Sequence, residues 1–228
     1  MESDGQAFAD DGSGVTGGVG DGCNEESRKL LNTKVKEETF NWRINFSTIP
    51  ENNLSNTEVQ DAFQAAHTNW THLQNPCGLS DTFGKSVSFA GGSDANSGVQ
   101  NTPGVGDICN HDLYDFISLN SFGALDNYAV TCINGKLDQG DNIVQSADVK
   151  YRQSTNYTIR PGDPDCNNAV DIESLATHEF GHVWGLDDLI QGHSPALTMT
   201  TGGGYRIRCN SALSSLAKGD VLGIKAKY

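Results

Sequence analysis

The sequence predicts an α+β fold, because stretches with helical spacing and stretches with strand-like alternation both occur in it. Residues 55–73 and 171–185 carry apolar side chains at helical spacing, each behind residues that cap a helix N-terminus. Residues 40–46 alternate apolar and polar side chains, as a strand with one buried face does. At 228 residues the chain is long enough for one domain, or for two lobes around a cleft.

The first helix is predicted to begin at the capping box Ser55-Asn56-Thr57-Glu58, whose serine and glutamate side chains satisfy backbone N–H groups. Its predicted buried face consists of Val59, Phe63, Ala66, Trp70 and Leu73. His67 and His72 lie on or near this helix. Neither has a partner at metal-binding spacing, so we expect them to be packing or surface residues.

Four strands are predicted, at residues 40–46, 85–90, 128–133 and 143–151. We expect the turn Asn134-Gly135 and the polar residues up to Asp141 to connect the last two. The chain is expected to end in a short helix that carries Leu216, Val221, Ile224 and Tyr228.

Two further segments lack apolar periodicity. Residues 1–22 are mostly Gly, Asp and Ser, and we expect a disordered leader or propeptide remnant there. Residues 91–107 predict a long loop. Calcium binding through oxygen ligands, with Asp94 as a candidate, is one use for such a loop, and a plain solvated loop is the alternative.

Composition limits the classes of protein and partner. Apolar residues make up 36% of the chain and charged residues 19%, and no apolar run approaches the ~20 residues of a membrane helix. The net charge of −14 disfavours nucleic acids and anionic membranes as partners, since both bind basic patches. The six cysteines form no Cys-x-x-Cys pair, which favours disulfides and therefore an oxidising compartment.

The candidate metal-binding and catalytic residues lie in the segment His178-Glu179-Phe180-Gly181-His182. On a helix capped by Asp171, both histidines lie on one face, one turn apart, and can bind the same metal ion. Glu179 is displaced by about 100° around the helix axis, where it can take a proton from a metal-bound water. Gly185 predicts a left-handed helix stop. A structural helix with coincidental histidines is the alternative.

A third ligand is expected shortly after Gly185, where the chain can turn sharply. Asp188 lies ten residues after His178 and three after Gly185, and Asp187 and His193 are the alternatives. His193 is the better ligand by type but needs a longer excursion of the chain. Three protein ligands plus a water form the pattern of a catalytic zinc, whereas a structural zinc usually has four protein ligands.

The run from His178 to Asp188 resembles the metzincin signature of zinc endopeptidases, His-Glu-x-x-His-x-x-Gly-x-x-His/Asp, and residues 197–200 around Met199 look like its Met-turn. The closest likeness is to matrixin-like secreted bacterial proteases. Asp188 stands where matrixins carry His, and here the chain resembles the small neutral proteases of streptomycetes, the snapalysin type. The likeness covers about residues 23–228, with further similar segments at 75–79, 129–132 and 216–228.

This resemblance implies a secreted, extracellular and monomeric endopeptidase with one catalytic zinc ion and protein or peptide substrates. The implied fold is a twisted five-stranded mixed sheet with an active-site helix, in an upper lobe that ends at about residue 185. A small irregular lower lobe, residues 186–228, ends in the C-terminal helix.

The resemblance also assigns roles to individual residues. Glu179 is the general base, Met199 forms a floor under the zinc, and Asp220 bonds to the backbone of the Met-turn. The edge strand that pairs with an extended substrate is placed at Asn127, Tyr128, Ala129, Val130 and Thr131.

The cysteine positions predict one disulfide and leave the others open. We expect Cys166, which precedes the active-site helix, to pair with Cys209, which follows the Met-turn. Such a bridge ties the lower lobe to the helix. The remaining four cysteines, Cys23, Cys77, Cys109 and Cys132, can pair in three ways.

Two other classes of function stay open. A catalytically silent zinc-binding module for adhesion or protein binding would keep the histidines but is expected to lose Glu179, which is present. A structural protein whose histidines bind no metal would contain no zinc after dialysis.

Overall fold

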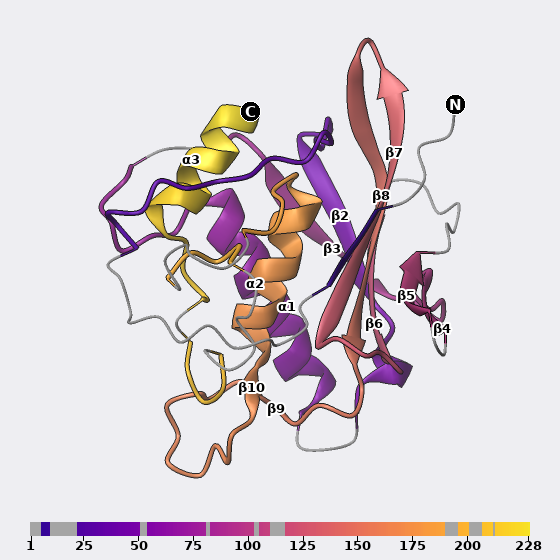
Figure 1. Ribbon diagram of the computed structural model, residues 1–228. Coiled ribbons are helices and arrows are strands. Elements are labelled where there is room, and N and C mark those ends of the chain that lie inside the picture. The colour runs from indigo at the N-terminus through magenta and orange to yellow at the C-terminus, as the bar shows by residue number, and fades with distance from the viewer. Residues whose placement is uncertain are drawn as a thin grey trace.

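The computed structural model describes residues 6–9, 22–50, 54–80, 83–102, 105–109, 117–189, 196–200, 207–211 and 213–228. In these residues the chain has the predicted α+β class, with a mixed β-sheet and three α-helices. The sheet is twisted, and helices lie against one of its faces (Figure 1).

The main sheet has six strands in the order β1-β7-β8-β6-β2-β3. They are β1 (Gln6–Ala9), β2 (Thr39–Ile44), β3 (Ser86–Gly92), β6 (Ile117–Gly123), β7 (Ala129–Asp138) and β8 (Asp141–Arg152). Strands β3, β2, β6 and β8 are parallel, whereas β7 is antiparallel to β8 and β1 is antiparallel to β7. Five of the strands form the expected mixed sheet, and β1 adds a sixth at its edge.

The α-helices are α1 (Asn56–Thr71), α2 (Ile172–Val183) and α3 (Lys218–Lys227). Helices α1 and α2 run side by side along one face of the sheet, where α2 contacts β7 and β8, and α3 lies beyond them (Figure 1). The smaller elements are η1 (Phe46–Thr48), the pair β4 (Val99–Thr102) and β5 (Gly106–Cys109), and the pair β9 (Tyr157–Thr158) and β10 (Val170–Asp171).

Helix α1 begins at the predicted capping box. The Ser55 hydroxyl accepts a hydrogen bond from Glu58 N, and the Glu58 carboxylate accepts one from Ser55 N. Near the other end, the Trp70 indole Nε1 donates to the Thr177 carbonyl of α2 at 2.7 Å. Both residues are buried, so water does not compete for this bond and it fixes α1 against α2.

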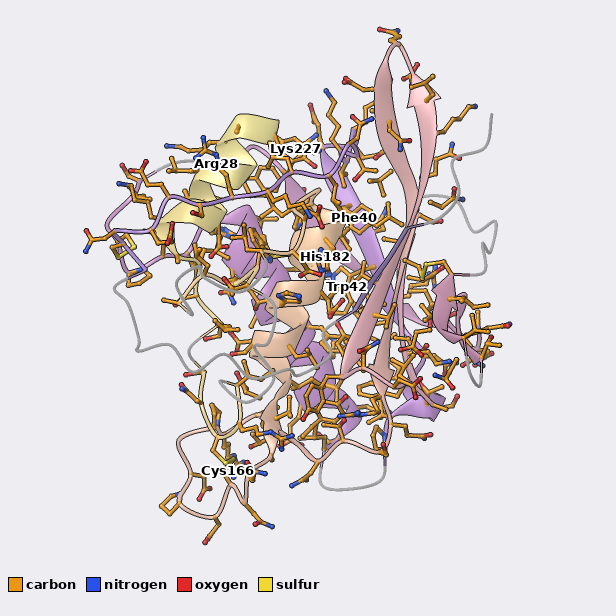
Figure 2. The ribbon with its side chains drawn as sticks, viewed as in Figure 1. Arg28, Phe40, Trp42, Cys166, His182 and Lys227 are labelled. Carbon is orange, nitrogen blue, oxygen red and sulfur yellow. A yellow bond between two sulfur atoms is a disulfide. The ribbon has the colours of Figure 1, made fainter. Side chains whose placement is uncertain are left out.

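The core lies between the helices and the sheet. Phe40, Trp42 and Ile44 of β2 are buried, which confirms the predicted alternation, and Figure 2 labels the first two. His67 of α1 is buried too, and its ring stacks on Phe180 of α2 with centroids 3.7 Å apart. Burial lowers the pKa of His67 to about 3, so this histidine packs as a neutral aromatic ring.

The hairpin between β7 and β8 differs from the sequence prediction. Asn134 and Gly135 lie inside β7, at a shift in its register with β8, and the chain turns at Gln139-Gly140. Both turn residues have positive φ, 51° and 96°, as a two-residue hairpin turn requires. The Asn-Gly signal is overridden because residues 136–138 still pair with residues 141–143.

Two segments predicted to lack structure contain strands. Within residues 91–107, β3 extends to Gly92 and β4 pairs with β5. Within the leader, Gln6–Ala9 form β1 and pair with residues 130–133 of β7. These short strands form on an available partner strand, which local composition does not reveal. The other leader residues before Gly22 lie outside the described part of the chain.

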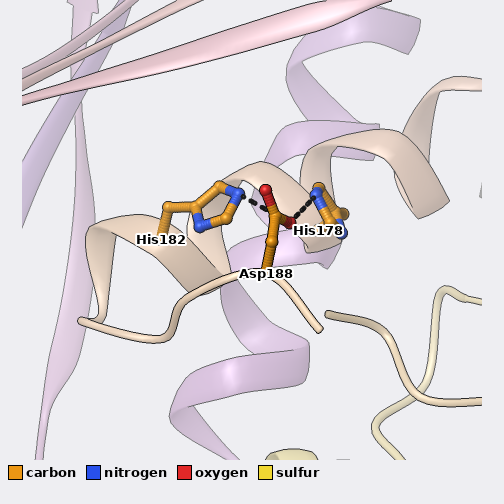
Figure 3. Close-up of side chains that lie close together, drawn as sticks. All are labelled: His178, His182 and Asp188. Atoms are coloured by element: carbon orange, nitrogen blue, oxygen red, sulfur yellow. Dashed lines mark ion pairs between the residues drawn. The ribbon is translucent and has the colours of Figure 1, made fainter. Parts of the chain in front are cut away.

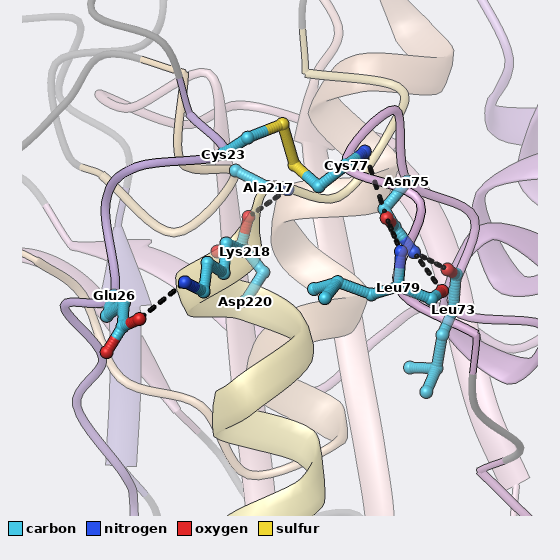
Figure 4. The surroundings of a disulfide bond; sticks show 9 residues. All are labelled: Cys23, Glu26, Leu73, Asn75, Cys77, Leu79, Ala217, Lys218 and Asp220. Atoms are coloured by element: carbon cyan, nitrogen blue, oxygen red, sulfur yellow. Dashed lines mark hydrogen bonds and ion pairs between the residues drawn. A yellow bond between two sulfur atoms is a disulfide. The ribbon is translucent and has the colours of Figure 1, made fainter.

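Three disulfides join distant parts of the chain: Cys23–Cys77, Cys109–Cys132 and Cys166–Cys209, the last as predicted. The first holds the N-terminal segment beside the start of α3, where Lys218 pairs with Glu26 at 2.5 Å (Figure 4). Such bridges indicate an oxidising compartment. Among the described helices, none has the length and apolar character needed to cross a membrane.

Replacing Cys166 and Cys209 together by serine should lower the free energy of unfolding by about 2–4 kcal/mol. The bridge closes 43 residues of chain around α2, and without it the unfolded chain gains conformational entropy. Urea unfolding of both proteins under non-reducing conditions measures the difference. An unchanged unfolding midpoint and slope would contradict a stabilising role for this bridge.

Candidate metal centre

Helix α2 supplies most of the candidate site. It begins at Asp171, whose carboxylate accepts a hydrogen bond from Ser174 N at 3.1 Å, as expected of its N-cap. His178, Glu179 and His182 lie on this helix, and all three are buried. The motif is therefore part of the protein interior and not a solvated helix face.

Gly185 turns the chain back toward the helix. Its φ is +88°, in the left-handed region that glycine adopts without strain, and Leu186 N donates to the Gly181 carbonyl at 2.9 Å. A side chain at Gly185 would also run into the Thr33 carbonyl. The reversal brings Asp188 across the helix face that carries both histidines (Figure 3).

Three side chains converge there. Asp188 Oδ1 lies 3.4 Å from His178 Nε2 and 3.6 Å from His182 Nε2. Ligand atoms around a tetrahedral ion, with bonds of about 2.0–2.1 Å, are about 3.4 Å apart, so this spacing fits a metal ion. Within the described residues this is the one group of three or more His, Cys, Asp or Glu that could hold a metal. Asp94, the calcium candidate, does not belong to it.

Backbone carbonyls orient both imidazoles. His178 Nδ1 bonds to the Thr198 carbonyl at 2.7 Å, and His182 Nδ1 bonds to the Leu186 carbonyl at 3.0 Å. Because a carbonyl oxygen can only accept, each Nδ1 carries the proton and each Nε2 presents its lone pair toward Asp188. The two rings are held in the tautomer that binds a metal.

The charge states suit a metal as well. Burial lowers the pKa of His182 to about 4, although Asp188 opposes this shift. Burial raises the pKa of Asp188, but the neighbouring His182 and His178 outweigh it, and the pKa of Asp188 lies below its usual value. Near neutral pH, His182 is therefore neutral and Asp188 is ionised, and these are the forms that coordinate a metal.

Residues 197–200 pack against the helix beside the histidines. Met199 is 2% exposed, and a Cβ added at Gly181 would lie 2.2 Å from its sulfur, so only glycine at position 181 leaves room for it. Asp220 of α3 accepts hydrogen bonds from Thr198 N at 2.9 Å and from Met199 N at 3.3 Å. The hydrogen bonds expected of Asp220 are present.

Glu179 contacts strand β7. Its Oε2 accepts a hydrogen bond from the Thr131 hydroxyl at 2.5 Å, and both side chains are fully buried. The sequence placed Thr131 in the edge strand but gave no sign of this contact. No spacing rule relates a strand residue to a helix residue 48 positions away.

The alternatives for the third ligand have different surroundings. The Asp187 carboxylate pairs with Lys29 Nζ at 2.6 Å and accepts a hydrogen bond from Asp188 N. His193 lies outside the described residues. The structure thus brings Asp188, and not Asp187, to the two histidines.

The predicted substrate strand lies only partly on β7. Ala129, Val130 and Thr131 belong to this strand, and β1 pairs with Val130 and Thr131. Asn127 and Tyr128 come before it. Asn127 Nδ2 donates to an Asp107 oxygen at 2.9 Å, and the Arg152 guanidinium lies 4.2 Å from the centre of the Tyr128 ring.

Comparison with known proteins assigns no family. No protein-family model matches the chain, and no curated protein matches its sequence significantly.

Proposed function

We propose that the protein is a secreted zinc endopeptidase of the metzincin type, similar to matrixin-like proteases. One observation carries the proposal: the ligand atoms of His178, His182 and Asp188 converge, and Glu179 lies on the same helix as the two histidines. Three protein ligands leave a coordination position for water or substrate, as in catalytic zinc sites. The mixed sheet and the packing of Met199 agree with this family.

The donor atoms favour zinc over other common ions. Two imidazole nitrogens and one carboxylate oxygen at tetrahedral spacing suit zinc. Calcium and magnesium prefer six or more oxygen ligands, and this site offers one carboxylate. Histidines that bind zinc usually donate a hydrogen bond from their other ring nitrogen. The Thr198 and Leu186 carbonyls accept such bonds from His178 and His182.

The proposed reaction is hydrolysis of a peptide bond. A zinc ion bound here would acidify a water molecule and polarise the scissile carbonyl. Glu179 accepts the water proton on its carboxylate during attack and donates it to the nitrogen of the leaving amine. Burial of Glu179 keeps bulk water away from this proton transfer.

An extended peptide is the proposed substrate, bound along the outer edge of β7. Backbone groups at a sheet edge pair with a strand of almost any sequence. Strand β1 supports this, because Gln6–Ala9 pair with β7 in antiparallel register, with Phe8 opposite Thr131. A substrate in that position would pass close to Glu179, which bonds to Thr131.

A secreted protease fits the remaining properties of the chain. Three disulfides agree with an extracellular location. The net charge of −14 argues for protein or peptide partners rather than nucleic acids or anionic membranes. A monomeric state stays a prediction.

A catalytically silent zinc-binding module is the alternative. It would need the same three ligands but no Glu179. Burying a carboxylate has a desolvation cost that a single hydrogen bond from Thr131 offsets only in part, and a silent module would gain nothing from the fully buried Glu179 beside its ligands. This cost favours the protease.

Digestion of a peptide library by the zinc-loaded protein, with and without a chelator, tests the proposal. We expect cleavage of internal peptide bonds that the chelator abolishes. Bound zinc without any cleavage would favour the silent module, and no bound zinc would favour a structural protein.

Glu179→Ala should keep the fold and the zinc content and lower turnover about 10²- to 10⁴-fold, because it removes the proton carrier and no ligand. Steady-state kinetics and metal analysis of the purified variant measure both. Retention of more than about a tenth of wild-type turnover would assign the general base to another group.

Asp188→Ala should lose zinc and activity, while the matched control Asp187→Ala should keep most of both. Asp188→His should still bind zinc and have its activity optimum at lower pH. A carboxylate neutralises part of the zinc charge, so its replacement by imidazole makes the bound water more acidic. Metal analysis measures the zinc content of the three variants, and pH–rate profiles measure the activity optimum of Asp188→His. Zinc loss in Asp187→Ala but not in Asp188→Ala would reverse the assignment.

Removing residues 1–10 should lower KM for peptides, by about 2- to 10-fold, because the tethered strand β1 then no longer competes for the edge of β7. Kinetics with one fluorogenic peptide compare the two forms, and unfolding midpoints check that the fold is unchanged. An unchanged or higher KM would place the substrate away from this edge.

A further inference from the structure

We infer that Thr131 is a positioning residue, whose hydroxyl holds the Glu179 carboxylate in the orientation needed for proton transfer. This inference rests on the proposed function, because it gives Glu179 the role of general base. Its structural part, the control of the Glu179 side chain by a residue of β7, can be tested without activity.

The contacts between the two residues are direct. The Thr131 Oγ1 donates to Glu179 Oε2 at 2.5 Å and also lies 3.3 Å from the Glu179 backbone carbonyl. Both residues are 0% exposed. A hydrogen bond from a hydroxyl to a carboxylate is short and charge-assisted, and in a buried site it is not weakened by competing water.

The donor itself is held in place. Thr131 lies within β7, opposite Val149 of the neighbouring strand β8, and α2 packs against both strands. A threonine side chain is β-branched, so its χ1 has few accessible values in a strand. The Oγ1 atom therefore has a fixed position relative to the helix that carries Glu179.

Fixing the carboxylate matters because a glutamate side chain is long and flexible. Many rotamers are open to such a side chain, and a base held in the wrong one reacts slowly. With Oε2 held by the Thr131 hydroxyl, the carboxylate of Glu179 keeps one orientation. The hydroxyl acts on the reaction only through Glu179 and does not touch the substrate.

The same residue also connects substrate docking to the base. The backbone of Thr131 is paired with Phe8 of β1, in the register that an extended peptide would take on this edge. Its side chain meanwhile bonds to Glu179. A peptide aligned on β7 is thus aligned, through one residue, with the group that protonates its leaving nitrogen.

Thr131→Val and Thr131→Ser separate the hydroxyl from the shape of the side chain. Valine keeps the β-branch and removes the donor, whereas serine keeps the donor. Thr39→Val is the matched control, because Thr39 is another strand threonine, in β2, that pairs with Ser86 at the exposed surface. All proteins are compared as zinc-loaded, full-length chains.

We expect Thr131→Val to lower kcat about 10- to 100-fold with KM within about twofold of wild type. Thr131→Ser should restore kcat to within about threefold, and zinc content should stay unchanged in both variants, whereas Thr131→Val should have a lower unfolding midpoint because the buried Glu179 carboxylate loses a hydrogen bond. Crystal structures of the zinc-loaded proteins give the readout that needs no activity: the Glu179 carboxylate should move in Thr131→Val and keep its place in Thr131→Ser.

Wild-type kcat in Thr131→Val, or an unmoved Glu179 carboxylate in its structure, would overturn the inference. An equal loss of kcat in the serine and valine variants would also overturn it, because the hydroxyl would then not be the group that positions Glu179. Failure of the wild-type protein to cleave peptides would reject the proposed function, and the Glu179 position in the two structures would still decide whether Thr131 holds it.

Discussion

The packing of α2 against both α1 and the sheet is the constraint on which the site depends. This helix carries both histidines and Glu179, so a shift of α2 would move three functional groups together. The bond from Trp70 Nε1 to the Thr177 carbonyl fixes it from the side of α1, and the Thr131 hydroxyl contacts it from β7. Because a protein interior is close-packed, the helix cannot move without opening voids.

The remaining parts of the site are attached to α2 by segments from both ends of the chain. The Thr198 carbonyl orients His178, and Asp220 of α3 fixes the turn that contains Thr198. On the other side, Leu31 N donates to the Gly185 carbonyl at 2.9 Å and supports the reversal that delivers Asp188. The geometry of the metal centre is therefore a product of long-range contacts, which the disulfides reinforce by limiting the separation of these segments.

The parts that the sequence predicted correctly depend on local signals. The capping residues Ser55 and Asp171 and the glycine at 185 act within a few residues of chain, so α1 and α2 could be placed from the sequence. The parts that it missed depend on distant partners. Strand β1 forms on the open edge of β7, and the contact of Thr131 with Glu179 joins residues that only the folded sheet brings together. The hairpin turn was predicted at Asn134-Gly135 but lies at Gln139-Gly140, because the pairing of β7 with β8 continues past the local turn signal.

A crystal structure of the zinc-loaded protein, with anomalous scattering recorded at the zinc edge, tests the proposed metal centre most directly. We expect one peak at about 2.0–2.2 Å from His178 Nε2, His182 Nε2 and an Asp188 oxygen, with a water as the fourth ligand within hydrogen-bond distance of Glu179. A peak closed by a fourth protein ligand, or no peak between these three side chains, would contradict it.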